Sequence, residues 1–287
     1  MRRMQLDNTL YLEVCEGLRR GTPPNIMLIK DLPKWLEAHK LSESGLFTTI
    51  CRYPTDDPYV GGVISDFYLD FDYEEAPDKA RKEAVAIVKK LMSDHNISET
   101  NIAIAFSGMK GVSVTIDPRV FNAELLDYLP LIWKSIVLEL ATKLKLKTVD
   151  TSIYERRRLW RLLNSKHQKT GLYKIPLTLT ELEKLTIDEI KELALKPRDP
   201  FIKSDAQPIP KAEKLFLEHK EKVEAWINER KKTFDAPELK TQTVDPPCIK
   251  RLLETGANPL RFQPRRNTCY TMHQTSSGNR RQQGRKE

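Results

Sequence analysis

Several features that mark other protein classes are missing from this 287-residue sequence. No stretch approaches the roughly 18 to 20 consecutive apolar residues that a membrane span needs, and no apolar segment with a cleavage site follows the N-terminus. The motif GxxxxGK[ST], which marks P-loop ATPases and helicases, is absent, and no internal repeat is visible. We therefore expect a soluble, cytoplasmic protein that makes no membrane contact.

Cysteine is also scarce. The four cysteines, Cys15, Cys51, Cys248 and Cys269, lie far apart and form no CxxC pair. This spacing indicates neither a disulfide framework nor a closed zinc site, and it fits a reducing compartment.

Positive charge is concentrated at the C-terminus. The formal net charge is +8, but the segment from Ala257 onward contains six Arg and one Lys against one acid. Because a basic tail is commonly a solvated chain end, net charge alone does not establish a nucleic-acid partner.

Alternating strand and helix patterns predict an α+β domain over residues 1–195. The first 45 or so residues are expected to mix helical patches with a proline-rich break. Strands are predicted in LFTTICRYP, VISDFYLDFDYE, NIAIAFSG, GVSVTID and YKIPLTL, with a further short strand in TVDTS. Helices are predicted in PDKARKEAVAIVKKLMSDHN, which places Ala84, Ile87, Val88 and Leu91 on one face, and in FNAELLDYLPLIWKSIVLELATKLKL, interrupted at Pro130.

Residues 196–245 are predicted to hold a proline-rich linker and an amphipathic helix. In this helix Leu215, Val223, Trp226 and Ile227 fall at helical spacing and are expected to pack as one stripe on the domain. Residues 246–287 form the third predicted segment, which ends in a basic, flexible tail.

Two aspartates follow the pattern of a single strand. In YLDFDYE the period-two geometry projects Asp70 and Asp72 from one face, while Leu69 and Phe71 point to the other. Adjacent carboxylates repel, and a hard divalent cation with a preference for oxygen ligands would resolve that repulsion. The alternative is that one aspartate caps a turn and both are solvated.

A glycine-containing hairpin is predicted in FSGMKGVSV. Glycines allow close approach of the backbone over Ser107 to Gly111, and Lys110 supplies a cation, so the turn could hold a phosphate. An ordinary hairpin with an exposed lysine is the alternative.

A third acid precedes a basic loop in TVDTSIYERRRLWRLLNSKHQKTGLYKIP. Asp150 is the acid, and Arg161, His167 and Lys169 are candidate donors to a triphosphate. The guanidinium fork of arginine can bind a phosphate bidentately, whereas the lysine ammonium is a mobile point charge.

The order of these three elements resembles the archaeo-eukaryotic primase superfamily. Catalytic subunits of that family carry an acidic DxD strand, an SGxxGxH hairpin, and a third acid followed by a basic loop of the form HPKTG…P. Here the corresponding stretches are YLDFD, SGMKGVS and VD…RLLNSKHQKTGLYKIP, within residues 46–180. The resemblance implies an α+β primase fold with an RRM-like antiparallel sheet, a second α/β unit and C-terminal helices.

The resemblance also implies a function and a set of site residues. The function would be a template-dependent DNA primase or DNA polymerase that joins nucleotides with two Mg²⁺ or Mn²⁺ ions and acts in DNA replication. Its metal ligands and catalytic acids would be Asp70, Asp72 and Asp150. Its nucleotide contacts would be Ser107, Gly108, Lys110, Ser113, Arg161, His167 and Lys169.

The sequence departs from the family pattern at one of these positions. Ser113 stands where the family motif has His, which leaves open how a triphosphate is held. A second, shorter resemblance lies in DPPCIKRLLETG, which is similar to the start of the iron–sulfur domain of primase large subunits, with Cys248 as the matching ligand. We expect a fusion of small-subunit-like and large-subunit-like parts, as in replication proteins of archaeal plasmids, and the charged composition would suit a thermophile.

The expected partners are a single-stranded DNA template, a primer and ribo- or deoxyribonucleoside triphosphates, with a replicative helicase or another replication protein as a further candidate. One alternative is a catalytically weak primase-like scaffold that binds nucleic acid or regulates another subunit. A polymerase associated with an end-joining ligase, from the same superfamily, is the other.

Overall fold

The computed structural model describes residues 9–73, 75–199 and 206–234. Its strands are β1 (Tyr11–Glu16), β2 (Ile26–Leu28), β3 (Leu46–Thr49), β4 (Cys51–Arg52), β5 (Ile64–Ser65), β6 (Phe67–Phe71), β7 (Ile102–Phe106), β8 (Val112–Ile116), β9 (Leu159–Arg161) and β10 (Ile175–Leu177). Its helices are α2 (Leu32–Ala38), α3 (Pro77–His95), α4 (Leu129–Leu144), α5 (Leu179–Lys184), α6 (Ile187–Leu193) and α7 (Pro210–Phe234), with short 3₁₀ turns η1 (Ile29–Asp31), η2 (Glu99–Asn101) and η3 (Pro118–Phe121).

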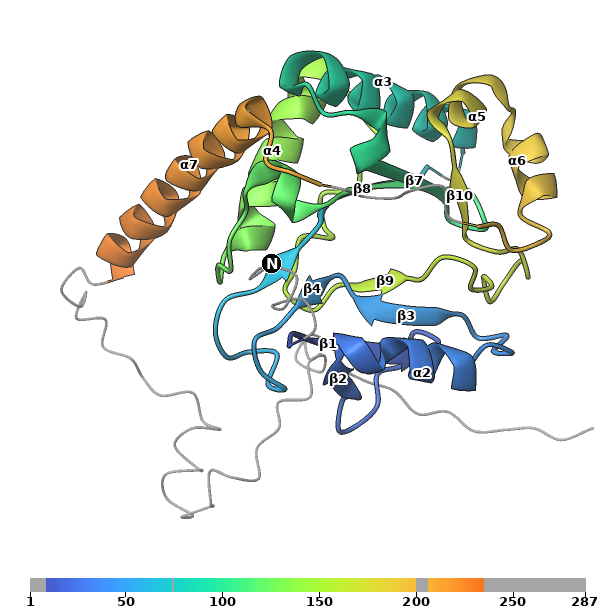
Figure 1. The fold of residues 1–287 in the computed structure, drawn as a ribbon. Coiled ribbons are helices and arrows are strands. Elements are labelled where there is room, and N and C mark those ends of the chain that lie inside the picture. Colours follow the sequence, from blue (N-terminus) through green and yellow to red (C-terminus); the bar gives the residue numbers. More distant parts are fainter. Residues whose placement is uncertain (1–8, 74, 200–205, 235–287) are drawn as a thin grey trace, which may run out of the picture. The chain divides into compact units, whose positions relative to one another are not determined.

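Two four-stranded antiparallel sheets form the centre of the fold (Figure 1). The first sheet has the order β10-β7-β8-β6, and the second has the order β2-β1-β3-β9. Strands β4 and β5 pair as a separate ribbon. The prediction of an α+β fold built on antiparallel sheets is confirmed.

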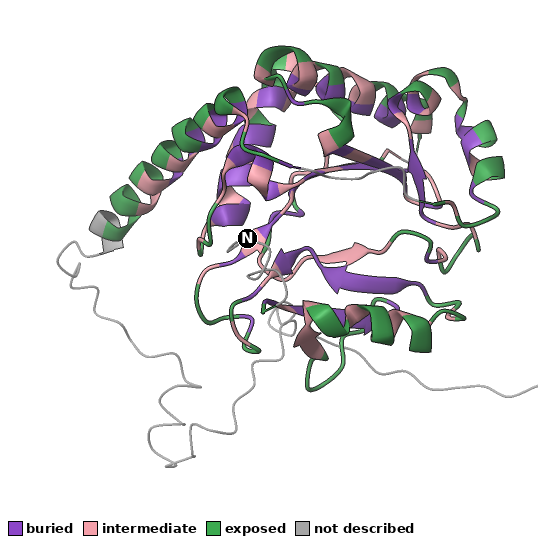
Figure 2. Cartoon of the chain, in the orientation of Figure 1, coloured by how far each residue is buried: buried purple, intermediate pink, exposed green. Residues whose placement is uncertain are grey.

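The two faces of the first sheet differ in composition. Phe67, Leu69 and Phe71 of β6 are fully buried, and α3 and α4 both contact this strand. Figure 2 shows the strands of this sheet as largely buried and α7 as largely exposed. On the opposite face the register places Asp70 beside Ser113, and Ser113 beside Ala105. Because side chains alternate along a strand, the apolar residues of β6 point into the core while Asp70 points toward the second sheet.

Helix α3 follows the predicted pattern. It begins at Pro77, and Asn96 caps its C-terminus in the left-handed conformation with a φ of 56°. The four residues predicted to share one face, Ala84, Ile87, Val88 and Leu91, are all fully buried. The helix therefore packs the apolar stripe that its sequence predicts.

Arg81 of α3 joins this helix to α5. Arg81 is only 8% exposed, and its guanidinium donates to the carbonyl oxygens of Leu182 (2.5 Å) and Glu183 (3.0 Å) and to the carboxylate of Asp78 (2.9 Å). The first two bonds satisfy carbonyl groups at the C-terminal end of α5, which a short helix leaves without intrahelical partners.

Replacing Arg81 with alanine is expected to lower the free energy of unfolding by about 2 to 3 kcal/mol, because buried carbonyl groups lose their donors. Urea denaturation would measure the change. The exposed neighbour Lys82 provides the control variant Lys82→Ala, which should stay close to the wild-type value. Equal stabilities of the two variants would contradict the structural role of Arg81.

Helix α7 packs against α4, α3 and η3. Leu215 and Val223 are buried, as predicted, and Ile227 is partly buried. The prediction that Trp226 packs on the domain is wrong, since Trp226 is 45% exposed and the Arg230 guanidinium lies over its ring, 4.4 Å from the ring centre. The buried residues of the stripe pack α7 against the domain without it.

Two local predictions are wrong, and one element was not predicted. The first segment contains helix α2, within the predicted helical part, but also strand β1, which pairs with β2 and with β3 some 30 residues further along the chain. Pro130 lies in the first turn of α4 and does not interrupt it, since a first-turn residue needs no intrahelical N–H bond. TVDTS forms no strand; Val149 makes only an isolated bridge to Phe71.

The described residues belong to one compact unit, Met1–Phe234. The segment predicted to resemble a primase large subunit, with Cys248 and Cys269, lies outside the described residues, as do parts of the predicted linker. None of the described helices is both long and apolar enough to cross a membrane.

Candidate active site

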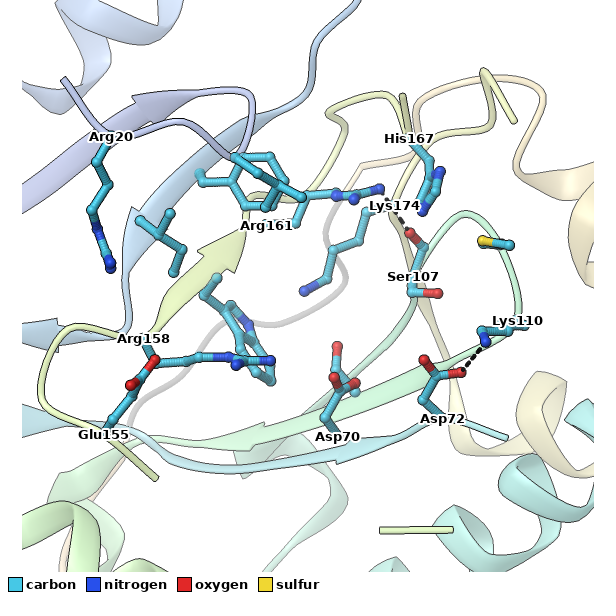
Figure 3. Close-up of a pocket in the computed structure, with 16 residues that line it drawn as sticks. Arg20, Asp70, Asp72, Ser107, Lys110, Glu155, Arg158, Arg161, His167 and Lys174 are labelled. Atoms are coloured by element: carbon cyan, nitrogen blue, oxygen red, sulfur yellow. Dashed lines mark hydrogen bonds and ion pairs between the residues drawn. The ribbon is translucent and has the colours of Figure 1, made fainter. Parts of the chain in front are cut away.

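A cavity of about 410 Å³ opens between the two sheets (Figure 3). We call it the intersheet cavity. It is lined by Leu18, Arg20, Phe47, Asp70, Asp72, Ser107, Met109, Lys110, Ser113, Glu155, Arg158, Leu159, Trp160, Arg161, His167 and Lys174. Its size falls within the range of small-molecule sites, and charged side chains account for half of its lining.

Asp70 and Asp72 enter the intersheet cavity from the end of β6. The backbone of the segment carrying Asp150 runs alongside: the Asp72 N–H donates to the carbonyl oxygen of Thr148 (3.0 Å), and the Asp150 N–H donates to that of Asp70 (2.8 Å). The third predicted acid is therefore adjacent to the pair through its backbone. Its own carboxylate accepts a bond from the Ser152 N–H at 2.7 Å.

Glu83 of α3 holds this adjacent segment in place. One oxygen, Oε2, accepts three bonds of 2.8 Å each, from the backbone N–H groups of Lys147 and Thr148 and from the Thr148 hydroxyl. A carboxylate that accepts several donors fixes a loop more firmly than a single backbone bond does. The position of Asp150 beside β6 thus depends on a helix residue outside all three sequence motifs.

The predicted hairpin forms between β7 and β8. The Ser107 N–H donates to the Gly111 carbonyl oxygen (2.9 Å), and the Ser107 hydroxyl accepts from the Gly111 N–H (3.0 Å). Gly108 has a φ of +86°, and a Cβ atom there would lie 2.9 Å from the carbonyl oxygen of Leu172. Glycine is required at this position both for its conformation and for the close approach of the basic loop.

The basic loop, residues 162–174, packs against this hairpin. The Thr170 hydroxyl donates to the Gly108 carbonyl oxygen at 2.6 Å, and the His167 N–H donates to the carbonyl oxygen of Leu172 at 2.7 Å. These bonds place the His167 ring at the intersheet cavity, whereas Lys169 does not line it. The hairpin and the loop, 60 or so residues apart in sequence, thus form one wall.

Positive charge exceeds negative charge around the intersheet cavity. Five basic side chains line it, Arg20, Lys110, Arg158, Arg161 and Lys174, against the acids Asp70, Asp72 and Glu155. In the described part of the chain, Lys110 pairs with Asp72 at 3.5 Å, whereas Arg158, Arg161 and Lys174 have no ion pair. Such a surplus of cations favours binding of a polyanion.

Arg161 links the two sheets across the intersheet cavity. Its guanidinium lies 5.1 Å from the centre of the Phe47 ring, and its Nη1 donates to the Ser107 carbonyl oxygen at 3.4 Å. Burial lowers the pKa of Arg161, and the negative charge of Asp70 opposes this. The guanidinium stays charged because its ordinary pKa is so high.

The pKa of Asp70 is raised from 3.8 to about 6. Burial is the largest cause, and the charges of Asp72 and Asp150 add to it, while Lys174 and Arg158 act in the opposite direction. Binding of a cation beside this carboxyl group would favour its charged form and so offset the effect of burial.

This shift predicts how stability depends on pH. The folded-state pKa of Asp70 lies above its unfolded value, so the folded protein binds more protons between pH 4 and 6 and loses stability as pH rises through that window. The variant Asp70→Asn lacks this loss. Its stability relative to wild type should therefore increase by about 1 to 3 kcal/mol from pH 4 to pH 7, allowing for the partial exposure of Asp70.

Urea denaturation in EDTA at the two pH values would measure this difference, since EDTA removes any bound divalent cation. Asp56→Asn, at an exposed position, is the control. A stability difference between Asp70→Asn and wild type that does not change with pH would contradict the raised pKa of Asp70.

His167 is neutral at physiological pH. Burial and the nearby charges of Arg161 and Lys169 lower its pKa to about 4. Its Nδ1 accepts a bond from the Lys169 backbone N–H at 3.2 Å, so the proton resides on Nε2. The ring can thus donate one hydrogen bond to an acceptor such as a phosphate oxygen.

The donor chemistry of Asp70 and Asp72 fits a hard divalent cation. Mg²⁺ in particular is often bound through one or two carboxylates together with substrate phosphates. Within residues 9–73, 75–199 and 206–234, however, no three His, Cys, Asp or Glu side chains lie close enough together to hold a metal ion. The participation of Asp150 as a third metal ligand stays a prediction.

The structure brings together most of the residues predicted for the site. Asp70, Asp72, Ser107, Lys110, Ser113, Arg161 and His167 line the intersheet cavity, and Gly108 supports its wall. Asp150 and Lys169 belong to the same sequence motifs but do not line the intersheet cavity. Their predicted roles are not tested by this arrangement.

Sequence reasoning missed several lining residues. Arg20 and Phe47 come from the N-terminal part, which carries no motif, and Arg158 and Trp160 come from the arginine-rich segment. Lys174 precedes β10 in the pattern YKIPL, where a lysine would be expected to face solvent. For Arg158, the only signal was the alternation of side chains in RRRLWR, which places Arg158 on the same side of the chain as Trp160.

No protein-family model and no curated protein matches the sequence. Among solved structures, the chain is similar to the polymerase domain of Ligase D from Mycobacterium tuberculosis in complex with DNA, at 16% identity and a TM-score of 0.42, covering 66% of this chain and 81% of that one.

Two further similar structures are those of primase RepB′. One has 10% identity and a TM-score of 0.38 over 83% of this chain and 67% of that one. The other is its catalytic domain in complex with initiator DNA, with 10% identity and a TM-score of 0.39 over 79% of this chain and 94% of that one. Identities and TM-scores this low mark distant likenesses.

Proposed function

We propose that this protein is a template-dependent nucleotidyltransferase, a DNA primase or DNA polymerase, whose active site is the intersheet cavity. The observation that carries the proposal is the placement of Asp70 near the end of β6 and Asp72 directly after it, with a surplus of cations around the same cavity. A pair of carboxylates suits a divalent cation, and the cations suit a triphosphate. Both are needed to transfer a nucleotide.

The reaction would join an incoming nucleotide to a 3′-hydroxyl. The hydroxyl oxygen forms a bond to the α-phosphorus, the bond from that phosphorus to the bridging oxygen breaks, pyrophosphate leaves, and the hydroxyl proton passes to solvent. Arg161 and Lys110 would bind the phosphates through charge, and His167 would donate its Nε2–H to one of their oxygens. Ser107 and Gly108 hold the hairpin against which these groups are arranged.

Asp70 and Asp72, with Asp150 as the predicted third ligand, would hold Mg²⁺ or Mn²⁺ ions. Such ions lower the pKa of the attacking hydroxyl and stabilise charge on the phosphates. The partners on this proposal are a single-stranded DNA template, a primer and nucleoside triphosphates. Template contacts would be mainly to the phosphate backbone and would weaken with salt.

Incorporation of labelled nucleotides tests the proposal. The full chain would be assayed on single-stranded DNA with and without a primer, in Mg²⁺ or Mn²⁺ and in EDTA. Products that require the divalent cation would support a polymerase, and products formed without a primer would make it a primase. DNA binding without synthesis under any condition would contradict the proposal and support the inactive scaffold, in which Ser113 in place of His would be the cause.

Replacing His167 with alanine is expected to raise the KM for the nucleotide about tenfold, with a smaller change in kcat, because one hydrogen bond to a charged phosphate is lost. His167→Gln keeps a side-chain donor and should recover part of the loss. Steady-state incorporation assays would give both constants. An unchanged KM in His167→Ala would remove this residue from the proposed site.

A further inference from the structure

Lys174 has an environment that is unusual for a lysine. It directly precedes β10 and is only 5% exposed. Its backbone is held on both sides, because its N–H donates to the Ser165 carbonyl oxygen (3.0 Å) and its carbonyl oxygen accepts from the Asn164 N–H (2.7 Å). The side chain therefore starts from a rigid position.

The ammonium group of Lys174 points into the intersheet cavity (Figure 3). Its nitrogen lies over the Trp160 ring, 4.7 Å from the ring centre. Among the residues that the structure describes, Lys174 has no ion pair and its ammonium has no hydrogen-bond acceptor. The negative charge of Asp70 favours the ammonium form but makes no ion pair with it. An ammonium buried without a paired anion is costly, so the arrangement indicates that an anion from outside the chain occupies this position.

Small side chains on the first sheet give Lys174 its room. Ser113 and Ala105 are neighbours across β8 and β7, and Ala105 is the neighbour of Pro176 on β10. Since Lys174 lies two residues before Pro176, it shares their face of the sheet and can extend over them toward Asp70. A large side chain at position 113 would fill that space.

The other groups around the ammonium define the anion. Arg161 and Arg158 also line the intersheet cavity, and the neutral His167 offers a donor from the hairpin side. Several cations and one neutral donor around a single cavity suit the oxygens of a phosphate chain, which carries more than one negative charge. A single carboxylate would satisfy only one of these cations.

We infer that Lys174 is a further substrate-binding residue, whose ammonium contacts a phosphate of the incoming nucleoside triphosphate. The inference rests on the proposed function and deepens it, because it places the phosphate chain above Ser113. A cation reaching over a small residue takes the space that the histidine of the SGxxGxH motif would occupy. The departure at Ser113 and the burial of Lys174 are thus two parts of one arrangement.

A purely internal role for Lys174 is the alternative. Its charge would then only offset that of Asp70, whose carboxylate also lies in the intersheet cavity. Under the proposed function, Asp70 holds a divalent cation and can no longer balance Lys174. The two roles differ in what the substitution changes: loss of a phosphate contact weakens triphosphate binding, whereas loss of a counter-charge acts on Asp70.

Isothermal titration of the full chain with a deoxynucleoside triphosphate, inorganic triphosphate and the unphosphorylated nucleoside, each in Mg²⁺, would test the inference. The variant Lys174→Met removes the charge and keeps the length of the side chain. It is expected to raise the Kd for both triphosphates about 10- to 100-fold and to leave nucleoside binding unchanged. Lys174→Arg keeps the charge and should bind triphosphate within a few-fold of wild type.

Lys166→Met is a matched control from the same loop. Lys166 also lies over an aromatic ring, that of Tyr173 at 5.7 Å, and it pairs with Glu43 without lining the intersheet cavity. The Lys166→Met variant should bind triphosphate with the Kd of the wild type. If Lys174→Met fails to fold by circular dichroism, Lys174→Gln, which is neutral but polar, takes its place in the same comparison.

The outcomes separate the inference from the proposed function. Wild-type affinity for triphosphate in a folded, uncharged Lys174 variant would overturn the inference alone. No binding of either triphosphate by the wild-type chain would overturn both. In incorporation assays the phosphate contact predicts a raised KM with kcat within a few-fold, and a fall in kcat with an unchanged KM would also overturn it.

Discussion

The double variant Asp70→Ala/Asp72→Ala is expected to lose at least about 1,000-fold in the rate of nucleotide incorporation. Both carboxylates enter the intersheet cavity from the end of β6, and their oxygens suit a divalent cation. Without them, the cations around the cavity would still bind a triphosphate, but the proposed Mg²⁺ or Mn²⁺ ions would lose their ligands. Triphosphate binding in the absence of divalent cations should therefore survive.

The fold of this variant is expected to remain intact. The pKa of Asp70 is raised chiefly by burial, and the charges of Asp72 and Asp150 add to this, so ionisation of Asp70 costs stability. Removing Asp70 relieves that cost, while the Asp72–Lys110 pair that is also lost is partly exposed and contributes little. Urea denaturation at pH 7 should give a free energy of unfolding no lower than that of the wild type.

A charge-matched control is available on the surface. Asp94→Ala/Asp188→Ala changes the net charge by the same amount at two exposed positions. Its incorporation rate should equal that of the wild type, which would show that the loss does not come from net charge. Retained incorporation in Asp70→Ala/Asp72→Ala would end the proposal that the intersheet cavity is a nucleotidyltransferase site.

Replacing Arg161 with methionine is expected to lower kcat/KM for the nucleotide by about 100- to 1,000-fold. Its guanidinium spans from the Phe47 ring on β3 to the Ser107 carbonyl oxygen at the hairpin, and so faces the cavity from both sheets. A fork of N–H groups in this position can bind a phosphate at two points. Arg161→Lys keeps the charge but lacks the fork of N–H groups, so its kcat/KM should lie between those of Arg161→Met and the wild type.

The control for this experiment is Arg230→Met. Arg230 also lies over an aromatic ring, that of Trp226 on α7, but it does not line the intersheet cavity. Steady-state kinetics of the three variants would separate the loss of a phosphate contact from a general effect of removing a stacked arginine. Equal kcat/KM values for Arg161→Met and Arg230→Met would contradict the assignment of Arg161 to the site.

Local sequence patterns were sufficient for the elements whose residues contact one another within a short stretch. The apolar face of α3 and its end near Asn96 follow from helical spacing and from a residue that tolerates positive φ. The hairpin between β7 and β8 follows from two apolar runs around glycines. In each case the decisive interactions lie within about 20 residues, so the sequence contains the pattern in readable form.

Patterns failed where the partners are distant in the chain. Strand β1 is stabilised by pairing with β3 more than 30 residues away, and its sequence alone gives little indication of this. Trp226 fits an apolar stripe by spacing, yet the stripe on α7 that finds a partner surface does not include it. The surface available to a helix is a property of its neighbours, which spacing cannot show.

For the site, the sequence by itself determined the chemistry that is available. Period two in YLDFD places two carboxylates on one face, and the glycine hairpin and basic loop supply phosphate donors. These are local consequences of strand geometry, glycine conformation and side-chain charge. Seven of the ten residues predicted for the site line the intersheet cavity as a result.

Tertiary structure alone decided which charges face one another. Lys174 is buried opposite Asp70 because β10 pairs with β7, and Arg158 and Phe47 reach the same cavity because β9 pairs with β3. Whether a lysine beside a strand faces water or a carboxylate depends on which surface covers it. That surface is assembled from segments more than 100 residues apart, and it buries Lys174 and, chiefly by burial, raises the pKa of Asp70.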